Sequence, residues 1–241
     1  MGRSSFSLAL LLAVGCQKGP VERVEWVTMD TVAAVQCRGR IAEEIRAVAQ
    51  GVCEEVVGEF SAFDSGSAIN RLGRCTPFGQ PCWDFAMRLR DETNGAFDPR
   101  WKHDGSLDFG AVAKGFAVDL AGERLLKLPN LPETLVDLGG NLKALKGDWT
   151  VGVQDGDTFT LRQGEACATS AKYYRGEHIR NAATGKMVAN GVYSVTVIHP
   201  SSAMVADGLS TVLFILGRER GEAFLRKYHP EAKAVWINAG L

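Results

Sequence analysis

The chain has 241 residues, of which 46% are hydrophobic and 23% are charged, and its formal net charge at pH 7 is −1. This composition is that of a globular protein large enough to bury a core, and it excludes a disordered chain or a bundle of membrane helices. Its 27 basic and 28 acidic side chains nearly balance. We therefore expect no nucleic-acid partner, because phosphates call for a basic surface.

The first residues have the pattern of an export signal rather than of a folded segment. Arg3 precedes the apolar run 6–14, which is short for a bilayer span, and small residues then lead to Cys16. This resembles a bacterial lipoprotein signal, which implies removal of residues 1–15, a lipid on Cys16 and a tether over 16–23. We expect an exported protein anchored to a membrane surface, facing the periplasm or the cell exterior. An ordinary secretory signal or an uncleaved anchor is the alternative.

Hydrophobic periodicity predicts the elements of residues 24–241, which we take as a single domain. In the first half we expect a β-rich run, a helix, a polar turn and a second helix, at 24–35, 41–60, 64–67 and 83–92. In the second half we expect strands at 107–110, 134–138, 142–145, 149–153, 158–162, 193–198 and 234–238, and helices at 113–126, 203–216 and 222–228. Because strands and helices do not alternate regularly, this order favours an α+β fold with mixed or antiparallel sheets packed against helices.

Five cysteines follow Cys16, and their spacing fits no common zinc or haem motif. Cys75 and Cys82 enclose the sequence CTPFGQPC, whose prolines and glycine suit a tight surface turn. In an oxidising compartment these two thiols are candidates for a disulfide.

The segment 107–119 (LDFGAVAKGFAVD) combines a strand end, a turn of small residues and the start of a helix. Free N–H groups and the helix dipole attract phosphate at such a place, and Lys114 adds a full positive charge. Glycines at 110 and 115 let a ligand approach the backbone closely. The segment predicts a phosphate site, with a solvated lysine as the alternative. Its Asp-Phe-Gly triplet is not a kinase signature, because no glycine-rich loop or His-Arg-Asp loop accompanies it.

Two further places are candidates for chemistry. Asp207 and Thr211 are four positions apart in the helix 203–216, so both project from one face. A carboxylate and a hydroxyl are oxygen ligands that suit Mg²⁺; a capping acid followed by an ordinary threonine is the alternative. His178 stands beside a polar turn and could accept a proton near neutral pH, although a lone histidine is more often structural.

Taken together and in this order, these segments resemble the FAD:protein FMN transferase (ApbE-like) family, from about Phe60 to Gly217. The most specific part is 107–119, which is similar to the family signature Asp-Leu-Gly-Gly-Ile-Ala-Lys-Gly-Tyr-Ala-Val-Asp. Residues 94–99 (NGAFDP) are similar to its Gly-Ala-Phe-Asp-Pro motif. Further similar segments lie at 60–63, 67–72, 136–141, 168–170, 178–179, 184–185, 195–197 and 206–217.

The resemblance implies an enzyme that moves the FMN half of FAD onto a threonine or serine hydroxyl of an acceptor protein, with Mg²⁺, and releases AMP. The implied FAD contacts are Met29, Phe63, Ala96, Phe97, Asp98, Asp108, Lys114 and Arg180. Met29 and Arg180 match the family pattern least closely. The implied Mg²⁺ ligands are the Ala111 carbonyl, Asp207 and Thr211. His178 is the candidate base, with Asp108 as a substitute, and Lys114 would stabilise charge on the departing AMP.

The chain departs from the family pattern in three places. Arg180-Asn181-Ala182 stands where the family has Ile-Asp-Pro, the link from Pro99 to Leu107 is short, and Phe63 replaces an aromatic residue that commonly carries a hydroxyl. Two other functions stay open: an FAD pyrophosphatase, in which water replaces the acceptor hydroxyl, and a non-catalytic flavin-binding lipoprotein. The short link favours the latter, whereas the retained metal and phosphate residues oppose it.

Overall fold

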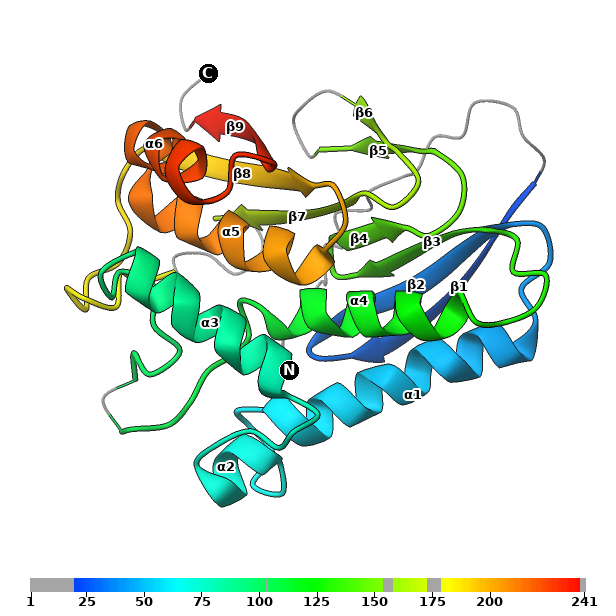
Figure 1. Ribbon diagram of the computed structural model, residues 1–241, viewed down its shortest axis with the longest axis horizontal. Helices are drawn as coiled ribbons and strands as arrows, with labels where there is room; N and C mark the ends of the chain where they lie inside the picture. The colour runs from blue at the N-terminus through cyan, green and yellow to red at the C-terminus, as the bar shows by residue number, and fades with distance from the viewer. Residues whose placement is uncertain (1–19, 103, 154–157, 173–178, 239–241) are drawn as a thin grey trace, which may run out of the picture.

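The computed structural model describes residues 20–102, 104–153, 158–172 and 179–238. The expected export signal, Cys16 and His178 therefore lie outside the described residues. Within them, the strands form a seven-stranded sheet of order β1-β2-β3-β4-β7-β8-β9 and a two-stranded sheet of β5 and β6 (Figure 1). Every neighbouring pair is antiparallel. The expected α+β class is confirmed.

The strands of the large sheet are β1 (Val21–Thr28), β2 (Thr31–Arg38), β3 (Glu133–Leu138), β4 (Asn141–Ala144), β7 (Ala166–Ala171), β8 (Val192–His199) and β9 (Lys233–Asn238). The small sheet consists of β5 (Trp149–Gly152) and β6 (Thr158–Leu161). The first β-rich run is thus a hairpin, whose turn at Met29 and Asp30 has positive φ angles of 49° and 56°. The prediction of a tether up to residue 23 was wrong in its last part, because Val21 already pairs with Arg38.

Two strand assignments also need correction. Residues 107–110 are not a strand but an extended segment and a turn, because they have no neighbouring strand; the Asp108 N–H donates to the Pro99 carbonyl at 2.8 Å instead. Strand β7 was not predicted as such. Its sequence ACATSA lacks the β-branched alternation that signals a strand, and its pairing with β4 and β8 decides its conformation.

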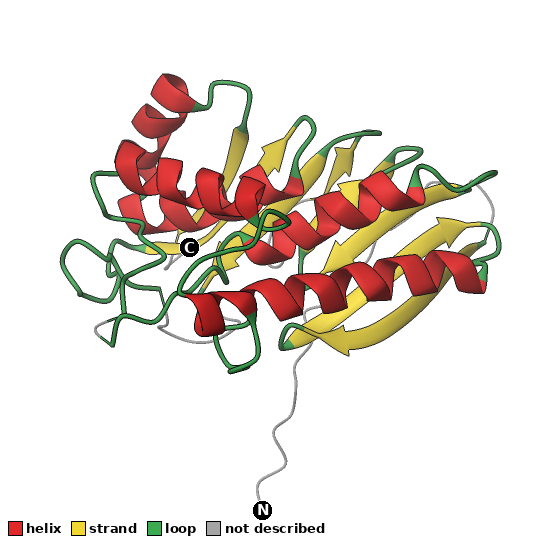
Figure 2. Cartoon of the chain, turned by 60° about the horizontal axis from the view of Figure 1, so that its bottom comes forward, coloured by secondary structure: helices red, strands yellow, loops and turns green. Residues whose placement is uncertain are grey.

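The helices are α1 (Glu43–Phe60), α2 (Ala68–Leu72), α3 (Gln80–Glu92), α4 (Ala113–Leu125), α5 (Ala203–Leu216) and α6 (Arg218–Tyr228). All but the short α2 were predicted, and α3 begins earlier than expected, with Pro81 in its first turn. Figure 2 shows the long helices lying together over one face of the large sheet. In the described part of the chain, none of the helices has the length and apolar character that crossing a membrane requires.

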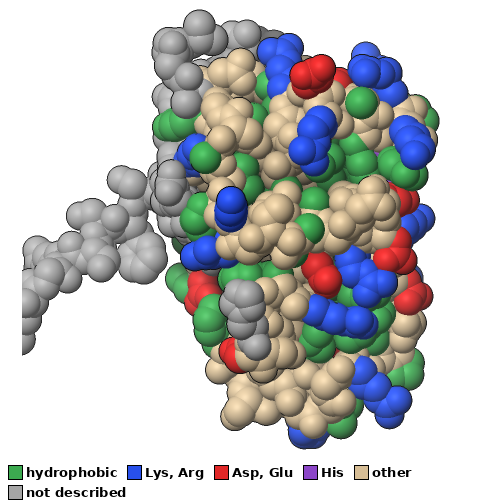
Figure 3. Space-filling model, turned by 90° about the vertical axis from the view of Figure 1, so that its left-hand side faces the viewer, with side chains coloured by type: hydrophobic (Ala, Val, Ile, Leu, Met, Phe, Trp, Pro, Cys, Tyr) green, Lys and Arg blue, Asp and Glu red, His purple; other side chains and the backbone are tan. Residues whose placement is uncertain are grey.

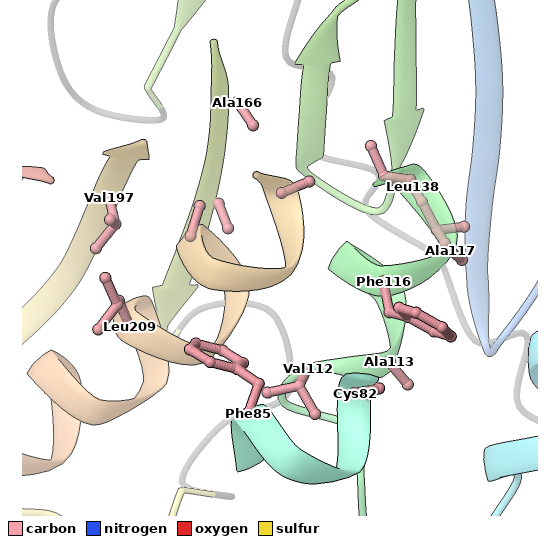
Figure 4. Packing of buried hydrophobic residues seen from close by; sticks show 14 of the residues in the cluster. Cys82, Phe85, Val112, Ala113, Phe116, Ala117, Leu138, Ala166, Val197 and Leu209 are labelled. Carbon is pink, nitrogen blue, oxygen red and sulfur yellow. The ribbon is translucent and has the colours of Figure 1, made fainter. Parts of the chain in front are cut away.

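The main core lies between this helical layer and the sheet. Figure 4 shows Phe85 of α3, Val112, Phe116 of α4 and Leu209 of α5 among its buried side chains. A second cluster lies on the opposite face of the sheet, where the β5–β6 hairpin covers it; its members are Leu135, Leu142, Ala144, Trp149, Val151, Leu161 and Cys167. Because both faces of the central strands are covered, the sheet is a rigid support for the loops at its end.

All five cysteines in the described ranges are free thiols, so the Cys75–Cys82 disulfide is not formed. Cys82 points into the core from α3, and burial, followed by the nearby Asp207 charge, raises the pKa of its thiol well above the usual value. Cys75 is partly exposed, and its Sγ contacts Gln80 Oε1 at 3.5 Å.

Helix α5 begins at a carboxylate that α4 supplies. Asp119 accepts hydrogen bonds from the backbone N–H groups of Ala203 and Met204 at 2.9 and 3.0 Å and from the Ser202 hydroxyl at 2.7 Å. Lys143 Nζ donates to it at 2.6 Å. These contacts satisfy N–H groups that a helix start leaves free, and they fix α5 to α4.

We expect Asp119→Ala to lower the free energy of unfolding by about 3 kcal/mol, because it removes the cap and leaves the half-buried Lys143 without its partner. Urea unfolding measures this. The matched control is Asp91→Ala, which breaks the exposed contact with Arg90 and should leave the free energy of unfolding unchanged within error. Equal effects of the two substitutions would contradict the role of Asp119.

Candidate active site

Two distant segments meet where α4 and α5 begin. Gly115 lies so close to α5 that a Cβ atom there would be 2.3 Å from the Ala203 carbonyl oxygen. Gly208 is equally enclosed, since its Cβ would lie 2.7 Å from Leu89 and 2.8 Å from Phe85. Both glycines thus serve close packing of the helices, and this packing brings the turn at 110–112 next to the first turns of α5.

Lys114 and Asp207 meet at this contact. Lys114 Nζ lies 3.8 Å from Asp207 Oδ2 and donates to the Gly110 carbonyl at 2.6 Å. Asp207 Oδ2 also accepts the Gly115 N–H at 2.9 Å. Asp207 is only 5% exposed, and desolvation raises the pKa of its carboxyl to about 6, against the opposing effects of Lys114 and the Gly115 N–H. A cation that bound this carboxylate would relieve the cost of its burial.

Thr211 follows Asp207 by one helical turn, as expected. Its Oγ1 lies 3.3 Å from the Ser170 hydroxyl of β7, which also contacts the Ser210 hydroxyl at 2.9 Å. Ser210 in turn donates to the Asp207 carbonyl at 2.9 Å. Ser170 and Ser210 entered the sequence argument only as members of similar segments and were given no role, although the spacing of three between Ser210 and Asp207 was a usable signal.

The oxygen donors around Asp207 fit a hard divalent cation. Mg²⁺ keeps several waters and takes one or two carboxylates rather than a dedicated cage. No group of three or more His, Cys, Asp or Glu side chains suited to a metal occurs among the described residues. The Thr211 hydroxyl and the Ala111 carbonyl are the other expected ligands. Lys114, which contacts both Gly110 and Asp207, links the turn that precedes Ala111 to α5.

Asp108 stands at the other end of the same turn. Its Oδ1 accepts the Gly110 N–H at 3.0 Å, and its Oδ2 lies 3.3 Å from Lys102 Nζ. The Asp108 N–H bond to Pro99 joins this turn to the loop 94–99. In that loop Asp98 Oδ1 accepts the Arg100 N–H at 2.8 Å. The two most specific motifs of the sequence are therefore neighbours in space.

Three other expected contacts line the same region. Ala96 and Phe97 are buried, and the Ala96 carbonyl accepts the Ala182 N–H at 2.9 Å. This bond places the loop after Arg180 against the 94–99 loop. Arg180 Nη1 donates to the Gly185 carbonyl at 3.2 Å, and its backbone pairs with Met187. The loop is therefore well formed without the Asp-Pro pair of the family pattern.

The remaining predicted residues are less closely joined to this centre. Phe63 follows α1, is 85% exposed, and its ring centroid lies 6.0 Å from Lys102 Nζ, which links it to Asp108. Met29 occupies the β1–β2 turn and packs partly against the main core. His178 lies outside the described residues, so its role as a base stays a prediction.

A cavity of about 270 Å³ lies elsewhere, between β1 and the start of α1, and is lined by Glu22, Arg23, Val24, Ile41, Ala42, Glu43 and Arg46. It contains none of the predicted site residues and carries charges of both signs. We assign the site to the contact of α4 with α5 instead, because charge, burial and metal-type donors converge there. On the side of the molecule that lies at the left in Figure 1, basic and acidic side chains are interspersed (Figure 3).

Comparison with known proteins identifies the family of this chain. The model of the ApbE family matches residues 100–236, more than half of the chain. The FAD:protein FMN transferase of Vibrio cholerae is 33% identical over 137 residues, which cover 48% of this chain and 40% of that protein. The FAD:protein FMN transferase of Treponema pallidum is 32% identical over 159 residues, 54% of this chain and 43% of that protein. Each match spans less than half of the relative's length.

Solved structures extend the likeness to the whole fold. The flavin transferase ApbE from Vibrio cholerae has a TM-score of 0.77 at 21% identity, covering 92% of this chain and 95% of that one. The apo form of the Pseudomonas stutzeri flavinyl transferase ApbE has a TM-score of 0.79 at 21% identity, covering 92% of each chain. At this identity the likeness establishes the fold alone, and the family model that matches residues 100–236 shows that the chain belongs to the ApbE family.

Proposed function

We propose that this protein transfers the FMN half of FAD to a serine or threonine hydroxyl of an acceptor protein, releases AMP and requires Mg²⁺. The observation that carries the proposal is the 3.8 Å contact between Lys114 and the buried Asp207, one helical turn from Thr211. The names of the sequence relatives support the reaction class. Retention of these three residues favours an active enzyme over a flavin carrier.

Lys114 and the start of α4 would hold the pyrophosphate. In the first turn of this helix the Ala113 N–H donates to the Phe109 carbonyl and the Gly115 N–H to Asp207, which leaves the Lys114 N–H for an anion. The Lys114 ammonium has three donors, and its contacts with Gly110 and Asp207 leave one for a phosphate oxygen. When bound by Asp207, Thr211 and the Ala111 carbonyl, Mg²⁺ would supply further positive charge against the phosphate oxygens.

The transfer makes one bond and breaks one. The acceptor hydroxyl oxygen attacks the FMN phosphorus and forms a phosphoester, while the bond from that phosphorus to the AMP oxygen breaks. The hydroxyl proton passes to a base, for which we propose His178, with Asp108 as the substitute. Little covalent work falls to the protein, so positioning and charge stabilisation should dominate the rate, as in other phosphoryl transfers.

Incubation of the purified protein with FAD, Mg²⁺ and a candidate acceptor tests the proposal. We expect flavin fluorescence on the acceptor in a denaturing gel and equimolar AMP, both lost when EDTA removes the cation. Free FMN with AMP and no labelled acceptor would indicate the pyrophosphatase. Bound FAD without any AMP would indicate the non-catalytic flavin-binding protein.

We also propose that the protein is exported and anchored by a lipid on Cys16. The support is the pattern of a short positive segment, an apolar run and small residues before that cysteine. Mass spectrometry of the mature N-terminus tests this proposal, and an N-terminal residue other than an acylated Cys16 would contradict it.

A further inference from the structure

We propose that Lys102 and Trp101, together with Phe63, bind the flavin ring of the dinucleotide; these three residues are called the flavin clamp below. The inference rests on the proposed function, because it concerns the same site. Residues 101 and 102 belong to the short link between the two most specific motifs, and neither motif contains them. The clamp therefore assigns a role to the part of the chain that departs most from the family pattern.

The Lys102 ammonium group lies near one carboxylate and two aromatic rings. Nζ lies 3.3 Å from Asp108 Oδ2, 6.0 Å from the centroid of the Phe63 ring and 5.9 Å from that of the Trp101 ring. The Lys102 side chain is only 24% exposed. These distances lie within the range of a cation–π contact with each ring. Two separate segments, the loop after α1 and the link 100–106, thus converge on one charge.

The Phe63 ring is left open to solvent. Phe63 is 85% exposed, although large aromatic side chains normally bury most of their surface. Trp101 is partly exposed, at 37%. A planar ligand lying on Phe63 would remove this apolar area from water and gain the offset stacking that aromatic pairs prefer. The isoalloxazine ring of a flavin is planar and aromatic, and its carbonyl oxygens and ring nitrogens accept hydrogen bonds from an ammonium group.

The charge arrangement points to the flavin rather than to a phosphate. Asp108 already neutralises Lys102 at 3.3 Å, which suits hydrogen bonding to an uncharged ring better than binding of an anion. The group that would match the pyrophosphate charge is Lys114, farther along the turn. Gly110 lies between the two places: its N–H donates to Asp108, and its carbonyl accepts from Lys114. The order along the site is therefore the clamp, the turn, and then Lys114 with Asp207.

Two backbone hydrogen bonds lie near Lys102 in the chain. The Asp108 N–H donates to the Pro99 carbonyl at 2.8 Å and closes the link into a loop, and the Trp101 N–H donates to the Asp98 carbonyl at 3.2 Å. Both bonds hold the backbone on either side of Lys102.

Binding of three probes to the full chain in EDTA tests the clamp without turnover: FAD, riboflavin and ADP. We expect Lys102→Met to weaken FAD and riboflavin binding about tenfold, as loss of a charge-assisted hydrogen bond predicts, and to leave ADP binding unchanged. Lys102→Arg should retain most of the affinity for riboflavin. Lys114→Met should also weaken FAD binding, but it should weaken ADP binding and leave riboflavin binding unchanged.

Lys227→Met is the matched control, because Lys227 Nζ lies 4.6 Å from the ring of Tyr228, which is 37% exposed like Trp101. It should change the affinity for none of the probes. Unchanged riboflavin binding in Lys102→Met, or weakened ADP binding, would overturn the clamp. A wild-type protein that binds FAD but no riboflavin would overturn the clamp and leave the proposed function standing. A wild-type protein that binds none of the probes would overturn both.

Discussion

Asp207→Asn should lower the rate of Mg²⁺-dependent AMP release by at least about a hundredfold, the scale of losing one charge-stabilising group at a reaction centre. The variant keeps the shape of the side chain and an oxygen that can accept the Gly115 N–H. It loses the negative charge that would hold the cation. Release of AMP from FAD, measured over a range of Mg²⁺ concentrations, checks this result.

The same substitution should stabilise the protein in the absence of metal. Desolvation raises the pKa of the Asp207 carboxyl from 3.8 to about 6, so the folded state holds this proton more tightly than the unfolded chain does. The stabilising contribution of the group is complete below pH 3.8 and is lost as the pH rises through about 6. At pH 7.5 we expect the asparagine variant to be more stable than wild type by about 1–3 kcal/mol, and at pH 5 by less.

Mg²⁺ should reverse this order, because a ligand that binds only the folded state stabilises it. We expect added Mg²⁺ to raise the melting temperature of wild type at pH 7.5 and not that of Asp207→Asn. Asp137→Asn is the control, since burial also raises the pKa of Asp137, which bonds the Gly140 N–H away from the site. It should keep the Mg²⁺ response. A full response in Asp207→Asn would contradict the metal assignment.

Gly115→Ala should lower the free energy of unfolding by about 2–4 kcal/mol and reduce AMP release with it. The new Cβ would lie 2.3 Å from the Ala203 carbonyl oxygen and 2.6 Å from the Met204 Cα. These are backbone atoms, which no rotamer change can move aside. Helices α4 and α5 would have to separate, and Lys114 would move away from Asp207.

Gly51→Ala is the control for this substitution. Gly51 lies within α1, and a Cβ there would have no atom within 4 Å. Alanine should therefore stabilise the protein by about 0.5–1 kcal/mol, because glycine is a poor helix residue. Urea unfolding of both variants measures the contrast. If Gly115→Ala were as stable as wild type, the close packing of α4 on α5 would not be required for the fold.

Much of the secondary structure followed from local pattern. The bounds of α5, Ala203–Leu216, were predicted as observed because an apolar run stands between a capping serine and a glycine. The failures have equally local causes. Strand β7 is rich in small residues, which carry little strand signal. The segment 107–110 alternates apolar and polar residues but has no partner strand, and the local sequence cannot show whether a partner exists.

The site, too, was predicted in part from the sequence, and the rest was decided by the tertiary structure. Helical geometry alone places Asp207 and Thr211 on one face, and the residue types in 107–119 indicate a phosphate site wherever that helix begins. The contact between Gly115 and Asp207, 92 positions apart, could not be read from the chain, and neither could the Ser170 hydroxyl contacts or the position of Lys102 beside Asp108. These contacts join segments that are far apart in the sequence. They form only when the helices pack against the sheet, so their distances depend on the packing of the whole core.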